Sequence, residues 1–207
     1  MPDLNKIYLY RMTHIENIPH ILQYGITHVD SQNANKAYLP IGDSSLISRR
    51  NDFTVPNGKT LGEYIPFYFG VRMPMLYVIQ KGFNGVTATP TEEIVYCITS
   101  VQQTINHQLD FVFTDGHAVD SFSSFYSLAD INSIDQYIDQ NAINRMYWKD
   151  ENDLDLKRRK EAEFLIGNDI PNIVILGFAV YNEAAKNRLI GFGIASNKVV
   201  INTGYYF

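Results

Sequence analysis

The chain has 207 residues, of which 45% are hydrophobic and 19% charged, the balance of an ordinary globular protein. This length suits one compact domain, so residues 1–207 are expected to form a single unit. No apolar run reaches the ~18 residues that cross a bilayer, and the N-terminus lacks the pattern of a signal peptide, which predicts a cytoplasmic protein without membrane contact. The formal charge of −5 argues against nucleic-acid binding over the whole surface but leaves room for a basic groove.

The first predicted elements are a strand and a short helix. Residues 7–12 alternate in the manner of a strand. A helix is then expected over 19–25, because proline suits a first turn and glycine readily ends a helix. Thr13 and His14 would fall in the turn between these elements, where ligand contacts are common.

The rest of the chain predicts a mixed fold. Residues 28–62 are polar and irregular, with a short helix near 45–51 and a turn at 56–58. Short apolar runs predict strands at 66–69, 75–79, 94–98, 111–113, 164–166, 173–180 and 199–201. Helical periodicity occurs at 101–107, 122–128, 134–147, 154–160 and 183–189. Because strands and helices do not alternate regularly, we expect an α+β domain with a split, mostly antiparallel sheet and flanking helices.

Several familiar chemistries lack their motifs. The single cysteine, Cys97, lies in an apolar run and is expected to be a small buried hydrophobe, which excludes a disulfide and a thiolate zinc site. The five histidines form no zinc-protease pair, and we expect no metal. No Walker loop, complete dinucleotide fingerprint or nucleophile elbow is present.

Glu163 is the most informative residue of the chain. It stands directly before the apolar run 164–166 and after four basic residues, 157–160, so a strand here would place a carboxylate at the edge of a cleft. Taken alone, the same pattern fits a carboxylate at a helix end, and the basic run fits a solvated helix face.

A series of blocks in the same order along the chain resembles the DarT family, bacterial toxins that move ADP-ribose from NAD to bases of single-stranded DNA. The blocks are Tyr10–His14 with Asn17, Arg49–Asn51, Tyr64–Phe69, Arg72–Tyr77, Phe111–Asp115 with His117, Tyr147–Trp148, Ala162–Leu165 and Tyr205–Tyr206. The resemblance implies the compact ADP-ribosyltransferase fold, with a split antiparallel sheet around an NAD cleft, and a glycosyltransferase reaction with NAD as co-substrate.

The resemblance assigns two catalytic residues. Glu163 falls on the family's catalytic glutamate, and a carboxylate at this place would stabilise the positive charge that builds on the ribose as nicotinamide leaves. Arg50 falls on the active-site arginine that binds NAD and helps to remove the proton of the target base. Because arginine is a poor base, we expect Arg50 to orient a phosphate or the base and to pass the proton through a relay. Glu161 is expected to be solvated, since the family usually has an uncharged residue there.

The resemblance also assigns binding residues. The NAD-binding block would be Arg11, Met12 and Thr13, with His20 and His28 lining the same pocket. Arg11 departs from the histidine of a well-known branch, and its guanidinium could grip a phosphate. His14 fits the block equally well as a ligand contact or as a turn histidine with its bonds satisfied. On the DNA side, stacking and positive charge would come from Arg49, Tyr147, Trp148, Arg158 and Arg159, with Trp148 in the core as the alternative.

Together these features predict an NAD-dependent ADP-ribosyltransferase that modifies a base in single-stranded DNA, because an unpaired base exposes its reactive atoms. Thymine is the first expectation for the base, and guanine is the alternative. The resemblance further implies a bacterial toxin with a macrodomain-containing antitoxin. We expect a monomer, although the sequence carries no signal for the oligomeric state. The rival interpretations are an NAD glycohydrolase, a transferase acting on RNA or protein, and a catalytically inactive nucleic-acid-binding module.

Overall fold

The computed structural model describes residues 1–207, apart from the side chain of Ser44. Its strands are β1 (Tyr8–His14), β2 (Ile65–Tyr68), β3 (Ile94–Ser100), β4 (Phe111–Thr114), β5 (Phe125–Tyr126), β6 (Glu163–Ile166), β7 (Gly177–Val180) and β8 (Val199–Ile201). Its helices are α1 (Ile18–Tyr24), α2 (Ser44–Arg50), α3 (Pro74–Lys81), α4 (Val101–Asn106), α5 (Ile134–Tyr137), α6 (Gln140–Asn144), α7 (Leu156–Lys160) and α8 (Glu183–Gly191). No helix among the described residues has both the length and the apolar character needed to span a membrane.

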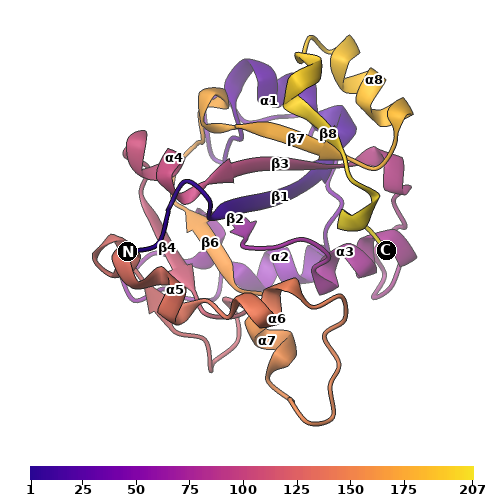
Figure 1. Cartoon of the computed structure of the whole chain (residues 1–207). Coiled ribbons are helices and arrows are strands. Elements are labelled where there is room, and N and C mark those ends of the chain that lie inside the picture. The colour runs from indigo at the N-terminus through magenta and orange to yellow at the C-terminus, as the bar shows by residue number, and fades with distance from the viewer.

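The strands form one sheet in the order β5-β4-β6-β2-β1-β3-β7-β8, in which β7 and β8 are the parallel pair. β1 and β2 meet at a single residue pair, Tyr10 opposite Tyr68, whereas β1 pairs with β3 along its whole length. The sheet is therefore divided into two halves that join at one point (Figure 1). This division confirms the predicted α+β fold with a split, mostly antiparallel sheet.

The join between the two halves aligns three side chains. Tyr10 on β1 is opposite Tyr68 on β2, and Tyr68 is opposite Glu163 on β6. Side chains of directly paired residues lie on the same face of a sheet. The first residue of β6 therefore stands beside the division between the halves.

Helices surround both halves of the sheet. In Figure 1, α1 and α8 lie beside the half that contains β7 and β8, while α5, α6 and α7 lie beside the other half. The main core contains aromatic and aliphatic side chains from both halves, including Leu9, Phe67, Phe113, Phe164 and Phe178. The site is thus built on strands that the core fixes in place.

Local chemistry explains the predicted helix over 19–25, which the structure confirms as α1. Pro19 stands in its first turn, where the missing N–H does no harm. Gly25 ends the helix with φ of +82°, and a Cβ added there would lie 2.1 Å from the carbonyl oxygen of Ile170. Both the positive φ and this close approach require glycine.

Three predicted elements were wrong. Residues 75–79, predicted as a strand, belong to α3, which begins at Pro74 and ends before Gly82 at φ +71°. Residues 122–128, predicted as a helix, contain the short β5 and loop up to the start of a 3-10 helix at Leu128. The helix predicted over 134–147 is broken into α5 and α6. Short apolar runs do not separate helix from strand, so proline and glycine were the better signals.

Smaller differences concern boundaries and burial. Thr13 and His14 are the last residues of β1 rather than a separate turn, and the strand expected from 173 begins at Gly177. Cys97 is buried as predicted, and burial raises the pKa of its thiol to about 12. A thiol with such a pKa is protonated at neutral pH and is not a nucleophile.

Candidate active site

Glu163 begins β6 and has no exposed surface. Its Oε1 accepts a hydrogen bond of 2.9 Å from the backbone N–H of Ala118, and its Oε2 accepts one of 2.9 Å from Nη1 of Arg50. Nε2 of His117 lies 3.9 Å from Oε1. Both oxygens are thereby held in place, as an electrostatic catalytic group requires.

Arg50 is the last residue of α2 and reaches Glu163 across 113 positions of sequence. The carboxylate of Asp43 caps the other end of this helix by accepting hydrogen bonds from the backbone N–H groups of Ser45 and Leu46. The Arg50 side chain is 14% exposed. Among the buried side-chain nitrogens and oxygens of the described residues, its Nη2 is the atom that has no hydrogen-bond partner. Buried polar groups are almost always satisfied, so an open donor here fits an acceptor atom on a bound ligand.

Tyr68 and Glu161 surround the Arg50–Glu163 pair. Burial raises the pKa of the Tyr68 hydroxyl, and the negative charges of Glu163 and Glu161 raise it further, so this phenol stays neutral. Glu161 was expected to be solvated, which is wrong: it is 8% exposed, and burial raises its pKa. The reason is that α7 ends at Lys160, after which the chain turns inward to enter a central strand.

The basic run 157–160 is not a solvated helix face either. Lys160 is fully buried, and its Nζ donates hydrogen bonds to the carbonyl oxygens of Ile143 at 2.9 Å and Arg145 at 2.5 Å. Burial lowers the pKa of this ammonium group to about 8. Lys160 therefore ties the end of α6 to the end of α7, directly before Glu161 and Glu163.

The predicted NAD-binding block lies at the division of the sheet. Arg11 donates from Nη1 to the carbonyl oxygen of Pro66 at 2.9 Å, a contact that bridges β1 and β2. Met12 packs against the hydrophobic cluster that includes Leu76 and Tyr96. Thr13 is buried, and its hydroxyl accepts a hydrogen bond from Nδ2 of Asn17.

The histidines near this block have protein partners. His14 accepts a hydrogen bond from the backbone N–H of Glu16 at Nδ1, so its Nε2 carries the proton that is donated to Glu93 at 3.2 Å. Nε2 of His20 lies 2.9 Å from the carbonyl oxygen of Asn33, and Nε2 of His28 lies 2.6 Å from that of Gly62. In these positions His20 and His28 anchor the long polar segment that contains α2.

A cavity of ≈430 Å³ lies at the beginning of α2. It is lined by His14, Glu93 and the segments 39–43 and 84–90. Arg50 stands at the opposite end of α2, about 10 Å away for a helix of this length. A second cavity, of ≈330 Å³, is lined partly by N-terminal residues and by residues of α5 and α6, and neither cavity is lined by Glu163.

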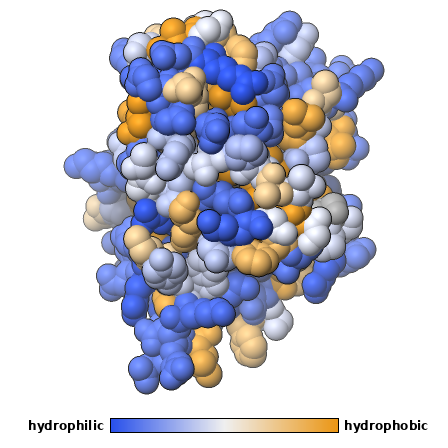
Figure 2. Space-filling model, turned by 90° about the vertical axis from the view of Figure 1, so that its right-hand side faces the viewer, coloured by the Kyte–Doolittle hydropathy of each residue, from blue (hydrophilic) through white to orange (hydrophobic). Residues whose placement is uncertain are grey.

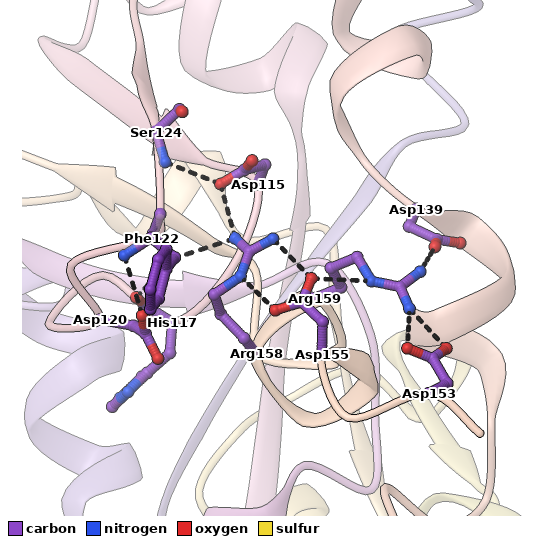
Figure 3. A network of polar contacts seen from close by, with 11 residues as sticks. Asp115, His117, Asp120, Phe122, Ser124, Asp139, Asp153, Asp155, Arg158 and Arg159 are labelled. Atoms are coloured by element: carbon purple, nitrogen blue, oxygen red, sulfur yellow. Dashed lines mark hydrogen bonds and ion pairs between the residues drawn. The ribbon is translucent and has the colours of Figure 1, made fainter. Parts of the chain in front are cut away.

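Two of the predicted DNA-binding arginines are held in ion pairs within the protein (Figure 3). Arg158 contacts Asp115 at 3.0 Å and binds the carboxylate of Asp155 with Nε and Nη2. Arg159 contacts Asp139, Asp153 and Asp155. Their charges are therefore largely neutralised by aspartates, although two of those aspartates are separated from them by many residues in the sequence.

The other predicted DNA-binding residues are more open. Arg49 and Tyr147 are exposed, and Tyr147 lies in the loop between α6 and α7 that projects from the lower edge of the molecule in Figure 1. The lower tip of the molecule is mostly hydrophilic in Figure 2. Trp148 is half-buried and packs edge-on against Tyr77 and Phe207, so it is partly a core residue.

His117, Ala118 and Tyr68 contact or adjoin Glu163, and the sequence did not predict them as site residues. His117 and Tyr68 lie in blocks that carry the family resemblance, but nothing in the linear sequence shows that they meet Glu163. Ala118 contributes through its backbone N–H, which no side-chain motif can reveal. Within the described chain, no group of three or more His, Cys, Asp and Glu residues could hold a metal ion.

A divided mixed sheet with an arginine and a buried glutamate facing each other beside the division fits the ADP-ribosyltransferase class. Comparison with known proteins identifies the family. The family model for DarT, described as ssDNA thymidine ADP-ribosyltransferase, matches residues 10–207. The chain belongs to the DarT family and is an NAD-dependent ADP-ribosyltransferase of single-stranded DNA.

Relatives and solved structures agree with this assignment. A DNA ADP-ribosyl transferase of Escherichia coli O127:H6 is 33% identical over 98% of this chain and 94% of its own length. The corresponding protein of Thermus sp. is 35% identical over 88% of this chain and 85% of its own length. The structure of Thermus sp. 2.9 DarT in complex with ADP-ribosylated ssDNA is 29% identical and superimposes with a TM-score of 0.83 over 100% of this chain and 98% of that one. Thermus sp. 2.9 DarT in complex with NAD+ gives a TM-score of 0.80 at 28% identity, over 100% of this chain and 99% of that one.

Proposed function

We propose that the chain attaches ADP-ribose to thymine in single-stranded DNA, with Glu163 and Arg50 as the catalytic pair, and that it acts in the bacterial cytoplasm as a toxin. The observation that carries the assignment is the buried ion pair between Arg50 Nη1 and Glu163 Oε2 at 2.9 Å, with Arg50 Nη2 left without a partner among the described residues. The thymidine specificity in the family description supports thymine, while guanine stays open because Arg11 departs from the family pattern.

The arrangement suits transfer to a base. The bond between the ribose and nicotinamide breaks, a bond from the ribose to a ring atom of the base forms, and the base loses a proton. Glu163 offers a fixed negative charge where positive charge builds on the ribose. Arg50 presents its open N–H to a phosphate or to a base oxygen, and the neutral Tyr68 hydroxyl stands beside them as a member of a proton relay.

We place NAD in the division between β1 and β2. Arg11 crosses this division and can turn its guanidinium from the Pro66 carbonyl to a phosphate. His20 and His28 act on the pocket indirectly, because they hold the segment that carries Arg50. Met12 and Thr13, which follow Arg11 on β1, complete the proposed NAD-binding block. Arg49, Tyr147 and Trp148 are the DNA contacts that we favour, because Arg158 and Arg159 are engaged with aspartates.

An antitoxin that removes the modification is the proposed partner. A relative from Thermosipho africanus is a DNA ADP-ribosyl transferase-DNA ADP-ribosyl glycohydrolase fusion protein, and this chain matches 49% of its length. Joining the two activities in one chain supports a functional pairing of the same kind here, with a macrodomain as the reversing enzyme. We propose that residues 1–207 act as one domain and as a monomer.

Intact-mass analysis of oligonucleotides tests the reaction and the base together. The protein is incubated with NAD and four single-stranded oligonucleotides, each of which carries one kind of base in an otherwise constant context. We expect one added ADP-ribose on the thymine oligonucleotide. Addition to the guanine oligonucleotide alone would show that guanine, not thymine, is the target base. Rapid nicotinamide release at a rate that added DNA does not change would favour the NAD glycohydrolase.

A further inference from the structure

The loop between β4 and β5, residues 115–124, carries two groups that lie against Glu163. Ala118 donates its backbone N–H to Glu163 Oε1 at 2.9 Å, and the His117 imidazole lies 3.9 Å from the same atom. These residues stand on a loop, so something must fix the loop for the carboxylate to keep its position.

Hydrogen bonds inside this loop close it on itself. Oδ1 of Asp115 accepts a hydrogen bond of 2.8 Å from the backbone N–H of Ser124, which joins the two ends. The hydroxyl of Ser123 donates to the carbonyl oxygen of His117 at 2.8 Å, and the backbone N–H of Asp120 donates to the same oxygen. These contacts fix the shape of the loop but do not attach it to α7, the helix that leads into β6.

Arg158 supplies the attachment (Figure 3). Its Nη1 donates to Asp115 Oδ1 at 3.0 Å and to the Ser123 hydroxyl at 3.3 Å, and its carbonyl oxygen accepts the backbone N–H of His117 at 3.0 Å. The other edge of the guanidinium forms two parallel hydrogen bonds to Asp155, at 2.7 and 2.8 Å. Such a two-pronged contact fixes the orientation of the group as well as its position.

Gly116 shows how closely the loop packs on this arginine. A Cβ added at Gly116 would lie 2.5 Å from Arg158 Nη1 and 2.7 Å from its Cγ. The guanidinium therefore rests against the backbone of Gly116, between Asp115 and His117. Arg158 itself stands on α7, five residues before Glu163, so one short segment carries both the carboxylate and the side chain that holds its neighbours.

We propose that Arg158 is a positioning residue for the transfer reaction: it fixes the 115–124 loop so that Ala118 and His117 stay against Glu163. This replaces the DNA-binding role that the basic run suggested, and it rests on the proposed catalytic role of Glu163. The guanidinium touches neither substrate. It acts through Asp115, Ser123 and the backbone of Gly116.

Steady-state kinetics of Arg158→Met tests this role, with Lys157→Met as the matched control, because Lys157 is exposed on the same helix and also carries one positive charge. We expect kcat per folded molecule to fall at least tenfold in Arg158→Met, with the KM values for NAD and for the oligonucleotide changing by less than threefold. Lys157→Met should stay within twofold of the unmodified protein. A rise in the KM for DNA at unchanged kcat would instead show that Arg158 contacts DNA, and would overturn the proposal.

Two further variants guard against misfolding. Asp115→Asn keeps an acceptor for Ser124 but removes the charge that Arg158 binds, so kcat should fall in the same direction by a smaller factor. Arg158→Lys should recover part of the activity, because an ammonium group can reach one of the two aspartates. Equal kcat in Arg158→Met and Lys157→Met, both folded, would contradict the proposal.

Hydrogen exchange separates this proposal from the proposed function. The Ala118 amide, which is bonded to Glu163, should exchange at least tenfold faster in Arg158→Met and at an unchanged rate in Lys157→Met. This readout needs no transferase activity. If the protein transferred no ADP-ribose, the proposed function would be refuted, but the exchange rates would still decide the positioning role. Unchanged exchange of the Ala118 amide in Arg158→Met would overturn the positioning role of Arg158.

Discussion

Two clusters of arginine and carboxylate in this molecule use the same chemistry for different ends. Arg50 and Glu163 form a single buried pair in which one guanidinium nitrogen has no partner among the described residues. Arg158 and Arg159 instead share four aspartates at the partly exposed end of α7. Open hydrogen-bonding capacity therefore supports the proposed reaction site better than the density of positive charge does. The donors of the second cluster are engaged with aspartates of the protein itself.

The comparison predicts the largest stability loss at the buried pair. Arg50→Met leaves the Glu163 carboxylate buried without its cation, and breaking one side of such a pair costs about 3 kcal/mol. Urea unfolding followed by circular dichroism measures the change. The double variant Arg50→Met with Glu163→Gln should regain most of the loss, because no buried charge is left. A single variant as stable as the unmodified chain would contradict this account of the pair.

Lys160 is a third case to set beside the two arginine clusters, because it is a buried cation whose hydrogen-bond partners are carbonyl oxygens rather than carboxylates. Its pKa of about 8 in the folded protein lies below the ordinary lysine value of 10.5, so the unfolded chain binds the proton more tightly between these values. Stability should therefore rise with pH between 8 and 10, by about 2 kcal/mol from this residue. Denaturation midpoints across that range measure the effect.

The control for this effect is Lys160→Met, which should lose the rise between pH 8 and 10. The raised pKa values of Cys97, Tyr10 and Tyr96 act in the opposite direction. These groups ionise in the unfolded chain, the thiol near pH 8.5 and the phenols near pH 10, and their ionisation stabilises the unfolded state. The two variants must therefore be compared at each pH. The same slope in both proteins would show that Lys160 is not the source.

The smallest stability loss is expected where Arg158 and Arg159 already have aspartate partners. Arg159→Met removes contacts to partly exposed aspartates, and pairs of this kind contribute about 1 kcal/mol or less. The hydrogen bonds from Arg158 lower the pKa of Asp155, so the contribution of that carboxylate exists above its ordinary pKa and is lost as the pH falls below about 4. The difference in melting temperature between Arg159→Met and the unmodified protein should be present at pH 7 and should shrink steadily as the pH falls below about 4, because the lowered pKa of Asp155 and Asp139 delays their protonation. A difference that does not shrink over that range would contradict the electrostatic origin.

The sequence predicted the divided antiparallel sheet, the helix over 19–25 and the position of α2, because these depend on local periodicity, proline and glycine. It failed at 75–79, where a short apolar run fits a helix as well as a strand. It also failed at Glu161 and Lys160, since a charged residue is expected in water until tertiary structure buries it. These errors arise from long-range packing, which local patterns do not contain.

For the site, the sequence selected Arg50 and Glu163 through a family resemblance, and the structure brings them into contact. It did not reveal His117 or the Ala118 N–H, whose relation to Glu163 depends on the pairing of β4 with β6. It also predicted that Arg158 and Arg159 contact DNA, and the structure shows both in ion pairs with aspartates that a run of like charges does not reveal. Asp115 and Asp139 neutralise them only after folding.

The most direct test of the central claim is the single-turnover rate of ADP-ribose transfer by Glu163→Gln to a thymine oligonucleotide. Glutamine keeps the shape of the side chain and one of its two hydrogen-bond acceptors, so it can still accept from the Ala118 N–H, while its amide group faces Arg50. The charge is removed, and circular dichroism checks that the variant folds. We predict a rate at least about 10³-fold below that of the unmodified protein, the effect of losing one fixed electrostatic group at a reaction centre. A rate within tenfold of the unmodified protein would show that the Glu163 charge does not drive the reaction.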